Sequence, residues 1–189
     1  MVTWQTDSVS KTESVFGMDT DGNFEISNSL KDFQSIGEES AMETLMKKTA
    51  MDRLDVEAVR VLLDHASAKI SNDFKRPACI AISDENGELL GFLRMDGGPA
   101  RSIRIAQCKA YTAARMQSST HDLFLRLERD KEDIRFFCDP RFTAFPGGNP
   151  LRNSENKIVG SVGISGLAPR EDHEVSEALA SLVKTWRNY

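Results

Sequence analysis

Apolar residues recur at helical spacing along much of the chain. In three long segments they stand three and four positions apart, which predicts amphipathic helices at residues 55–73, 102–116 and 168–186. A shorter helix is expected to begin at Ser119, because Ser is a favoured N-cap and apolar residues follow it. Ser40 and Glu43 fit a capping box, which predicts a further helix over residues 39–52.

Two β-hairpins are expected between these helices. Residues 77–84 form a short apolar run, and residues 89–95 return after an Asn-Gly pair at 86–87, which is typical of a tight hairpin turn. Residues 151–155 and 158–166 predict a second pair of strands. This order of elements favours an α+β fold in which helices cover an antiparallel sheet.

The first 37 residues differ from the rest of the chain. Residues 1–37 are rich in Ser, Thr, Asp and Asn, and their scattered apolar residues follow no regular period. They are too few to form a core of their own, so we expect an irregular N-terminal arm that orders only by docking. Residues 38–189 are then expected to form one domain.

Composition narrows the classes of partner and the compartment. The net charge of −5 argues against nucleic acid, which attracts clustered Lys and Arg. The chain has three cysteines with no metal-binding spacing, which favours a reducing compartment. No signal peptide and no apolar run near the ~20 residues of a membrane span is visible, so we expect a cytoplasmic protein with no membrane partner.

Small residues with a charged neighbour recur through the second half. They form four motifs: Arg-Met-Asp-Gly-Gly at 94–98, Lys-Ala-Tyr-Thr-Ala at 109–113, Phe-Pro-Gly-Gly-Asn-Pro at 145–150, and Val-Gly-Ser-Val-Gly-Ile-Ser-Gly at 159–166. Glycine-rich turns let a backbone approach a ligand or another chain closely, and they bring polar groups to strand ends. Each motif alone is weak evidence for a ligand site. The order and spacing of the four motifs are more informative than any one of them.

With these motifs the chain resembles the GlcG/HbpS family, which also includes the C-terminal domain of some corrinoid adenosyltransferases. The matching segments are residues 81–87, 94–97, 109–113, 120–123, 147–150, 159–166 and 171–174, and the resemblance spans roughly residues 54–184. The resemblance implies a five-stranded antiparallel sheet flanked by helices and a symmetric homo-oligomer. It also implies binding of haem or a related tetrapyrrole. Some members carry an iron-linked Glu-x-x-Glu pair where this chain has Arg104 and Gln107, so that iron site is not expected here.

Two pairs of polar residues are candidates for binding an anionic ligand. Arg94 and Asp96 either form an anion-binding arginine oriented by a carboxylate or a salt bridge that closes the hairpin. Lys109 and Thr112 share one helical face, where they either contact a small carboxylate or hold the neighbouring Gly-Gly turn.

The Gly147-Gly148 loop and Phe145 are candidates for the wall of the pocket. The two amides could cradle an anion, or the glycines could allow a tight bend that admits no side chain. Phe145 could cover a flat ligand or fill the core.

Histidines are the candidate haem-iron ligands, because imidazole is a common axial ligand. The resemblance places His121 near the expected pocket, which makes it the first candidate, with His65 as the second. His173 and Glu177 lie four apart and could chelate a metal, although a solvated acidic helix end explains them as well.

Two principal functions follow from these residues together with the resemblance. The first is binding of haem or a similar flat anionic molecule by a homo-oligomer. The alternative is a cofactor-free enzyme that acts on a small organic acid or aromatic metabolite, with Lys109 or His121 as acid or base and Arg94 holding a carboxylate. A third possibility is an assembly protein that docks through its N-terminal arm.

Overall fold

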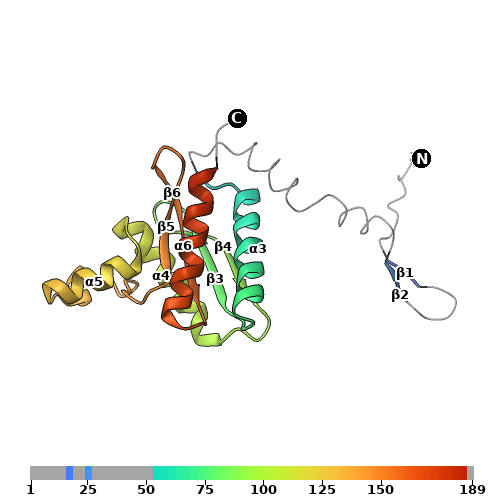
Figure 1. The fold of residues 1–189 in the computed structure, drawn as a ribbon, viewed down its shortest axis with the longest axis horizontal. Coiled ribbons are helices and arrows are strands. Elements are labelled where there is room, and N and C mark those ends of the chain that lie inside the picture. The colour runs from blue at the N-terminus through green and yellow to red at the C-terminus, as the bar shows by residue number, and fades with distance from the viewer. Residues whose placement is uncertain (1–15, 19–23, 27–52, 187–189) are drawn as a thin grey trace, which may run out of the picture. The chain divides into compact units, whose positions relative to one another are not determined.

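A computed structural model describes residues 16–18, 24–26 and 53–186 (Figure 1). The chain divides into two units, residues 1–41 and 42–189. In the first unit, β1 (Phe16–Met18) pairs antiparallel with β2 (Phe24–Ile26). The helix expected over 39–52 lies outside the described residues, and the boundary expected at residue 37 stays a prediction.

The second unit contains an antiparallel sheet. Its strands are β3 (Cys79–Ser83), β4 (Leu89–Arg94), β5 (Gly148–Arg152) and β6 (Ile158–Ser165). They lie in the order β4-β3-β6-β5, so β4 and β5 are the edges. This confirms the expected α+β architecture, and residues 53–186 supply four strands where the resemblance implied five.

Both predicted hairpins are present, and the second begins earlier than expected. The β3–β4 turn is closed by Asp84, whose Oδ1 accepts hydrogen bonds from the amides of Asn86 and Glu88. Strand β5 starts at Gly148 instead of Leu151, because the Gly-Asn-Pro segment pairs with β6. A proline is compatible with that position because β5 is an edge strand.

Four helices pack with the sheet. They are α3 (Val56–Asp73), α4 (Ala100–Met116), α5 (Thr120–Asp130) and α6 (Pro169–Thr185). Helix α4 begins two residues earlier than the expected start at residue 102. Asp55 accepts from the amide of Ala58 at the start of α3, and Ser119 accepts from the amide of Asp122 at the start of α5. A short 3-10 helix, η1 (Ile134–Phe137), follows α5.

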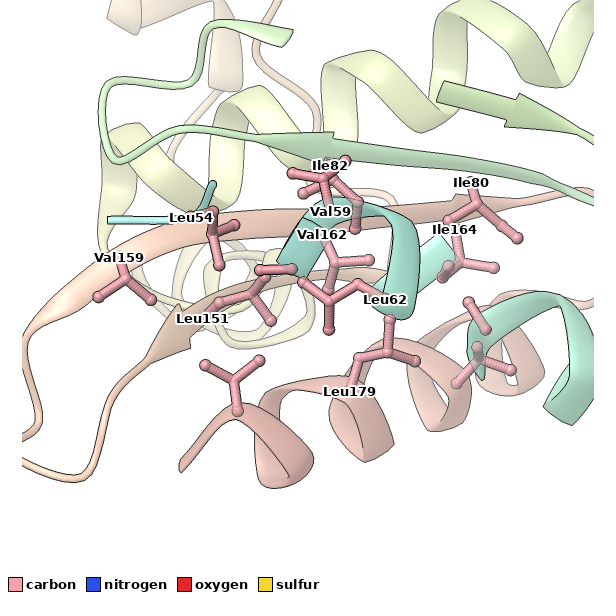
Figure 2. Close-up of a cluster of buried hydrophobic side chains, with 14 of the residues drawn as sticks. Leu54, Val59, Leu62, Ile80, Ile82, Leu151, Val159, Val162, Ile164 and Leu179 are labelled. Carbon is pink, nitrogen blue, oxygen red and sulfur yellow. The ribbon is translucent and has the colours of Figure 1, made fainter. Parts of the chain in front are cut away.

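The main core lies on one face of the sheet, under α3 and α6. Figure 2 shows apolar side chains from the helices, such as Leu62 and Leu179, pointing toward Ile80, Val162 and Ile164 on the strands. All five of these side chains are fully buried. The core therefore joins α3 and α6 to the two central strands, β3 and β6. The other face of the sheet is covered by α4.

Helix α4 covers that other face at short range. Cys79 and Ala81, which alternate with Ile80, pack against Ala106 and Ala110 of α4. A Cβ atom added at Gly163 of β6 would lie 2.1 Å from the carbonyl oxygen of Ala106. The row of alanines on α4 and the glycine on β6 are therefore needed for the helix backbone to lie directly on the sheet.

Candidate functional site

Lys109 of α4 lies inside the protein and makes two bonds at its ammonium group. Its side chain is fully buried, and Nζ donates to the carbonyl oxygen of Ile164 at 2.7 Å and to Asp172 Oδ2 at 2.7 Å. Of the two interpretations of Lys109, the structure shows the one in which it holds the loop at the end of the sheet. A substrate would have no access to this amine for proton transfer.

Asp172, in the first turn of α6, completes a buried ion pair. Its Oδ1 accepts from the amide of Leu167, so both carboxylate oxygens are engaged. Burial lowers the pKa of Lys109 and raises the pKa of Asp172, while the opposite charge of each partner acts against that change. A pair of this kind costs much when one partner is removed, because the other is left charged in the interior. The sequence did not identify Asp172 as a residue of the site. The only signal for it is that it is an acidic residue in the first turn of α6, four residues after the N-cap Ala168.

The Gly147-Gly148 loop is packed against this ion pair. Gly147 has φ +121°, and a Cβ there would lie 2.8 Å from Lys109 Nζ. The amide of Gly148 donates to Thr120 Oγ1 at 2.9 Å, and the carbonyl of Gly147 accepts from the amide of Ile164. These contacts fit the interpretation of the glycines as a tight bend without room for a side chain.

Thr112 holds the loop that leads to these glycines. Its Oγ1 donates to the carbonyl of Cys108 and accepts from the amide of Thr143 at 2.9 Å. Phe145 follows in the same loop, with its ring centroid 5.0 Å from Lys109 Nζ. Phe145 is 48% exposed, so it covers the buried lysine and still offers half of its surface outside.

A pair of imidazoles lies beside the Gly147-Gly148 loop. His121 in the first turn of α5 and His173 in the first turns of α6 face each other, with ring centroids 4.7 Å apart and planes inclined by 37°. His173 directly follows Asp172, and His121 directly follows Thr120, so both rings are positioned by the buried contacts of their neighbours. The expectation that His121 lies near the motif cluster agrees with this geometry, whereas the partnership with His173 was not foreseen.

The surroundings of His173 favour its neutral form. Desolvation by burial lowers its pKa, and the nearby His121 lowers it further, against the raising effect of Glu177 and Asp122. Its Nδ1 atom is buried without a hydrogen-bond partner in the described part of the chain. A neutral imidazole has a free lone pair, which is the form that binds a metal.

Apolar side chains flank His121 on the exposed face of α5. Phe124 and Leu125, three and four residues after His121, are 41% and 51% exposed. Phe136 of η1 is 76% exposed. Figure 1 shows α5 extending away from the sheet.

Arg94 and Asp96 lie apart from this cluster. Arg94 is at the end of β4, and the Gly147-Gly148 loop is at the start of β5, the opposite edge of the sheet. Three strand spacings separate the two edges, roughly 14 Å. Arg94 Nε donates to the carbonyl of Gly98 at 2.8 Å, so the arginine closes its own turn through a carbonyl and makes no ion pair with Asp96 in the described residues.

His65 is also remote from His121. It lies on α3, which packs on β3, β4 and α6, while α5 packs on β5 and α4. Within residues 53–186 no group of three or more His, Cys, Asp or Glu side chains is arranged to hold a metal ion. One protein chain therefore does not bring His65 and His121 to a common iron.

A shallow groove between α3 and β4 is the other place where a flat molecule could lie. It has a volume of about 710 Å³, and Val56, Leu90 and Phe92 contribute apolar surface to it. No histidine lines it. Haem in this groove would have no imidazole ligand from the residues that form it.

The model of the family described as haem degrading protein HbpS-like matches residues 54–181. The chain belongs to this HbpS-like family. The match covers the sheet, its two hairpins and nearly all of the four helices, and it confirms the resemblance drawn from the motifs. None of the helices in the described ranges is long and apolar enough to cross a membrane.

Known structures and relatives agree with the family. A double mutant of HbpS from Streptomyces reticuli is 26% identical, covers 71% of this chain and 90% of that one, and gives a TM-score of 0.61. The crystal structure of a PduOC:heme complex is 20% identical, covers 72% of this chain and 99% of that one, and gives a TM-score of 0.63, which shows the same fold. The corrinoid adenosyltransferase PduO of Citrobacter freundii is 26% identical over 64% of this chain, and the match spans 36% of that enzyme.

Proposed function

We propose that this protein binds haem, or a similarly flat anionic molecule, at the His121–His173 pair. The single observation that carries the proposal is a partly exposed imidazole pair beside which apolar side chains are exposed, and the lowered pKa of His173 agrees with it. Membership of the HbpS-like family supports it, and so does the haem in the PduOC complex, a structure with this fold.

His121 is the iron ligand in this proposal, and His173 is the residue that positions it. The two rings face each other at 4.7 Å, which leaves no space for a macrocycle between them. Only one of them can therefore bind the iron of a given haem. His121 lies on the projecting helix next to Phe124 and Leu125, whereas Nδ1 of His173 is buried.

The surface around His121 fits the other needs of a porphyrin. Phe124 and Leu125 offer exposed apolar area on the same side of α5 as the imidazole. A haem laid on this side would remove that area from water, which is the main favourable contribution to binding a flat apolar ring. Bound there, haem would supply an iron centre, and the protein would set its orientation and its access to water.

A homo-oligomer and a cytoplasmic location complete the proposal. A haem on an exposed helix face has one side open, and a second copy of the chain could cover it. Cys79, Cys108 and Cys138 are all free thiols, which supports a reducing compartment. Native mass spectrometry with and without haemin tests the assembly, since a monomer in both conditions would contradict it.

A haemin titration followed at the Soret band tests the site. We expect saturable binding, and we expect His121→Ala to weaken it by about tenfold or more, equivalent to about 1.4 kcal/mol. His173→Ala is expected to change the Soret position less, because that ring positions the ligand without binding iron. His65→Ala is the matched control and should leave the titration unchanged.

The outcomes separate the proposed site from the alternatives. Binding that is equal in wild type, His121→Ala and His173→Ala would overturn the imidazole site and leave the groove beside β4 as the place to search. Binding that is lost only in His65→Ala would overturn the assignment in favour of α3. Absence of any Soret shift in the wild type would contradict haem as the ligand.

A further inference from the structure

A small pocket lies between the β3–β4 hairpin and α4, away from the imidazole pair. It has a volume of about 160 Å³. Four residues of α4 line it at helical spacing, Arg104, Gln107, Cys108 and Tyr111, and the turn residues Gly87 and Glu88 face them. Arg141, from the loop after η1, completes the wall.

Arg141 is fixed in this wall by several contacts. Its Cζ lies 3.8 Å from the centroid of the Tyr111 ring, and its Nη2 donates to the Tyr111 hydroxyl at 2.8 Å. Tyr111 in turn donates to Asp139 Oδ2 at 2.5 Å, and Arg141 Nε lies 3.5 Å from Asp139 Oδ1. Because these bonds hold the guanidinium in place, little side-chain entropy is lost when it binds an anion.

Arg104 is the second cation of the pocket, and it has no competing partner. In residues 53–186 no carboxylate or carbonyl accepts a hydrogen bond from it, although its side chain is exposed at the pocket. Glu88 lies 3.8 Å from Arg141 Nη1, so the pocket also contains one carboxylate. Among the residues that line the cavity, Arg104 and Arg141 are positive and Glu88 is negative, so the lining carries a net positive charge.

The size of the pocket limits what it can hold. A cavity volume of about 160 Å³ has room for a small molecule only. Sites for drug-sized molecules measure about 300–1,000 Å³, so a tetrapyrrole cannot enter here. Planar guanidinium groups bind carboxylates through paired hydrogen bonds, and the amide of Gln107 can add another donor.

We propose that this pocket binds a small carboxylate, of the size of a dicarboxylic acid of three or four carbons, between Arg104 and Arg141. The site is separate from the imidazole pair, because it is built on the hairpin turn and the outer face of α4. Its ligand is too small to be haem, so it provides a second binding function that does not depend on the proposed first one.

Cys108 gives a probe of the pocket, because it is a free, half-buried cysteine that lines the cavity. In the full-length protein, alkylation of each cysteine by iodoacetamide can be followed by peptide mass spectrometry. Malonate is expected to slow alkylation at Cys108 and to leave Cys138, an exposed thiol outside the pocket, unaffected. Ionic strength is kept constant with chloride, so that general screening does not produce the effect.

Two variants and one matched control test the assigned residues. Arg104→Gln and Arg141→Gln should each weaken the protection by malonate about tenfold, as expected for loss of a charge-assisted bond. Arg101→Gln removes the same charge from the exposed surface of α4, three residues before Arg104 and outside the pocket lining, and should leave the protection unchanged. Circular dichroism of each variant confirms that it is folded.

Each outcome supports or overturns the proposal. Protection by malonate that depends on Arg104 and Arg141 supports it. Equal protection at Cys108 and Cys138, or protection that persists in both variants, overturns it. Protection by inorganic phosphate but not by malonate overturns the assignment to a carboxylate, and absence of protection by either anion overturns the anion site.

Discussion

Helix α4 carries two cationic residues with different roles, Lys109 and Arg104. They are five positions apart and lie on opposite sides of the helix. Lys109 lies in the buried motif, where its ammonium group binds Ile164 and Asp172 and stabilises the end of the sheet. Arg104 lies outside the motif on the exposed side, beside a cavity, with no partner in the described ranges. The comparison shows that the residues which identify the family are largely those which hold its fold. Arg104, which has no partner among the described residues, lies outside the four motifs.

The same contrast holds for the glycines and the histidines. Gly147, Gly148 and Gly163 are buried against backbone atoms of α4 or against Lys109. His121 and His173 are partly exposed and adjoin that buried region through Thr120 and Asp172. The buried contacts thus fix the position of side chains that point outward.

The largest expected effect comes from breaking the buried ion pair. Lys109→Met should lower the free energy of unfolding by about 3–5 kcal/mol, because Asp172 is left charged and unpaired in the interior. Urea denaturation measures it, with Arg104→Met as the comparison, which should unfold like the wild type. Adding Asp172→Leu to Lys109→Met should recover part of the loss. A loss below about 1 kcal/mol in Lys109→Met would contradict the role of the pair.

The second effect comes from separating α4 and the sheet. In Gly163→Ala the new Cβ would lie 2.1 Å from the carbonyl oxygen of Ala106, so the helix must shift. We expect a loss of about 3 kcal/mol or more in thermal or urea unfolding. Gly97→Ala is the control, since its nearest neighbour is a proline side-chain atom at 3.4 Å. The control variant is destabilised only by the strain of positive φ, about 1 kcal/mol. An equal loss of stability in both variants would contradict the close packing of α4 on Gly163.

A smaller effect is expected at the loop that carries Phe145. Thr112→Val removes the oxygen that accepts from the amide of Thr143, at a cost of about 1 kcal/mol. Thr185→Val near the end of α6 is the control, because its exposed hydroxyl bonds only a carbonyl of its own helix. Hydrogen exchange of the Thr143 amide should rise in the first variant and stay the same in the second.

The smallest effect is a dependence on pH from the imidazole pair. The folded pKa of His173 is lowered, so between the unfolded value of about 6.5 and the folded pKa the unfolded chain binds more protons. Stability should therefore fall as pH falls through this window and be unaffected above it. Urea midpoints measured across the window should fall less steeply in His173→Gln, and an unchanged slope would contradict the assignment.

Local sequence patterns predicted most of the elements. The Asn-Gly pair predicted the β3–β4 hairpin, and Ser119 predicted the N-cap of α5. These succeeded because turns and caps depend on residues within a few positions of one another. The start of β5 was misplaced at Leu151, because a Gly-Gly-Asn-Pro segment has no local preference for a strand and is extended only by its pairing with β6.

The candidate site was less accessible to sequence reasoning. The expected pocket contained Lys109, His121 and Phe145 but not Asp172, Thr120 or His173, which lie next to them in the structure or in the chain. It also contained Arg94, which lies on the opposite edge strand. Partners of this kind are distant in sequence: Lys109 and Asp172 are separated by 63 positions. Spacing along one helix cannot indicate contacts between α4, α5 and α6.

The sequence by itself determined the family, the order of helices and strands, and the requirement for small residues along α4 and β6. Those features follow from periodicity, turn chemistry and the size of side chains, which are properties of neighbouring residues. Only the tertiary structure decided which charged groups are paired in the interior and which are exposed without a partner among the described residues. Burial and partnership depend on which elements meet, and here they gave Lys109 an internal partner and left Arg104 beside a cavity.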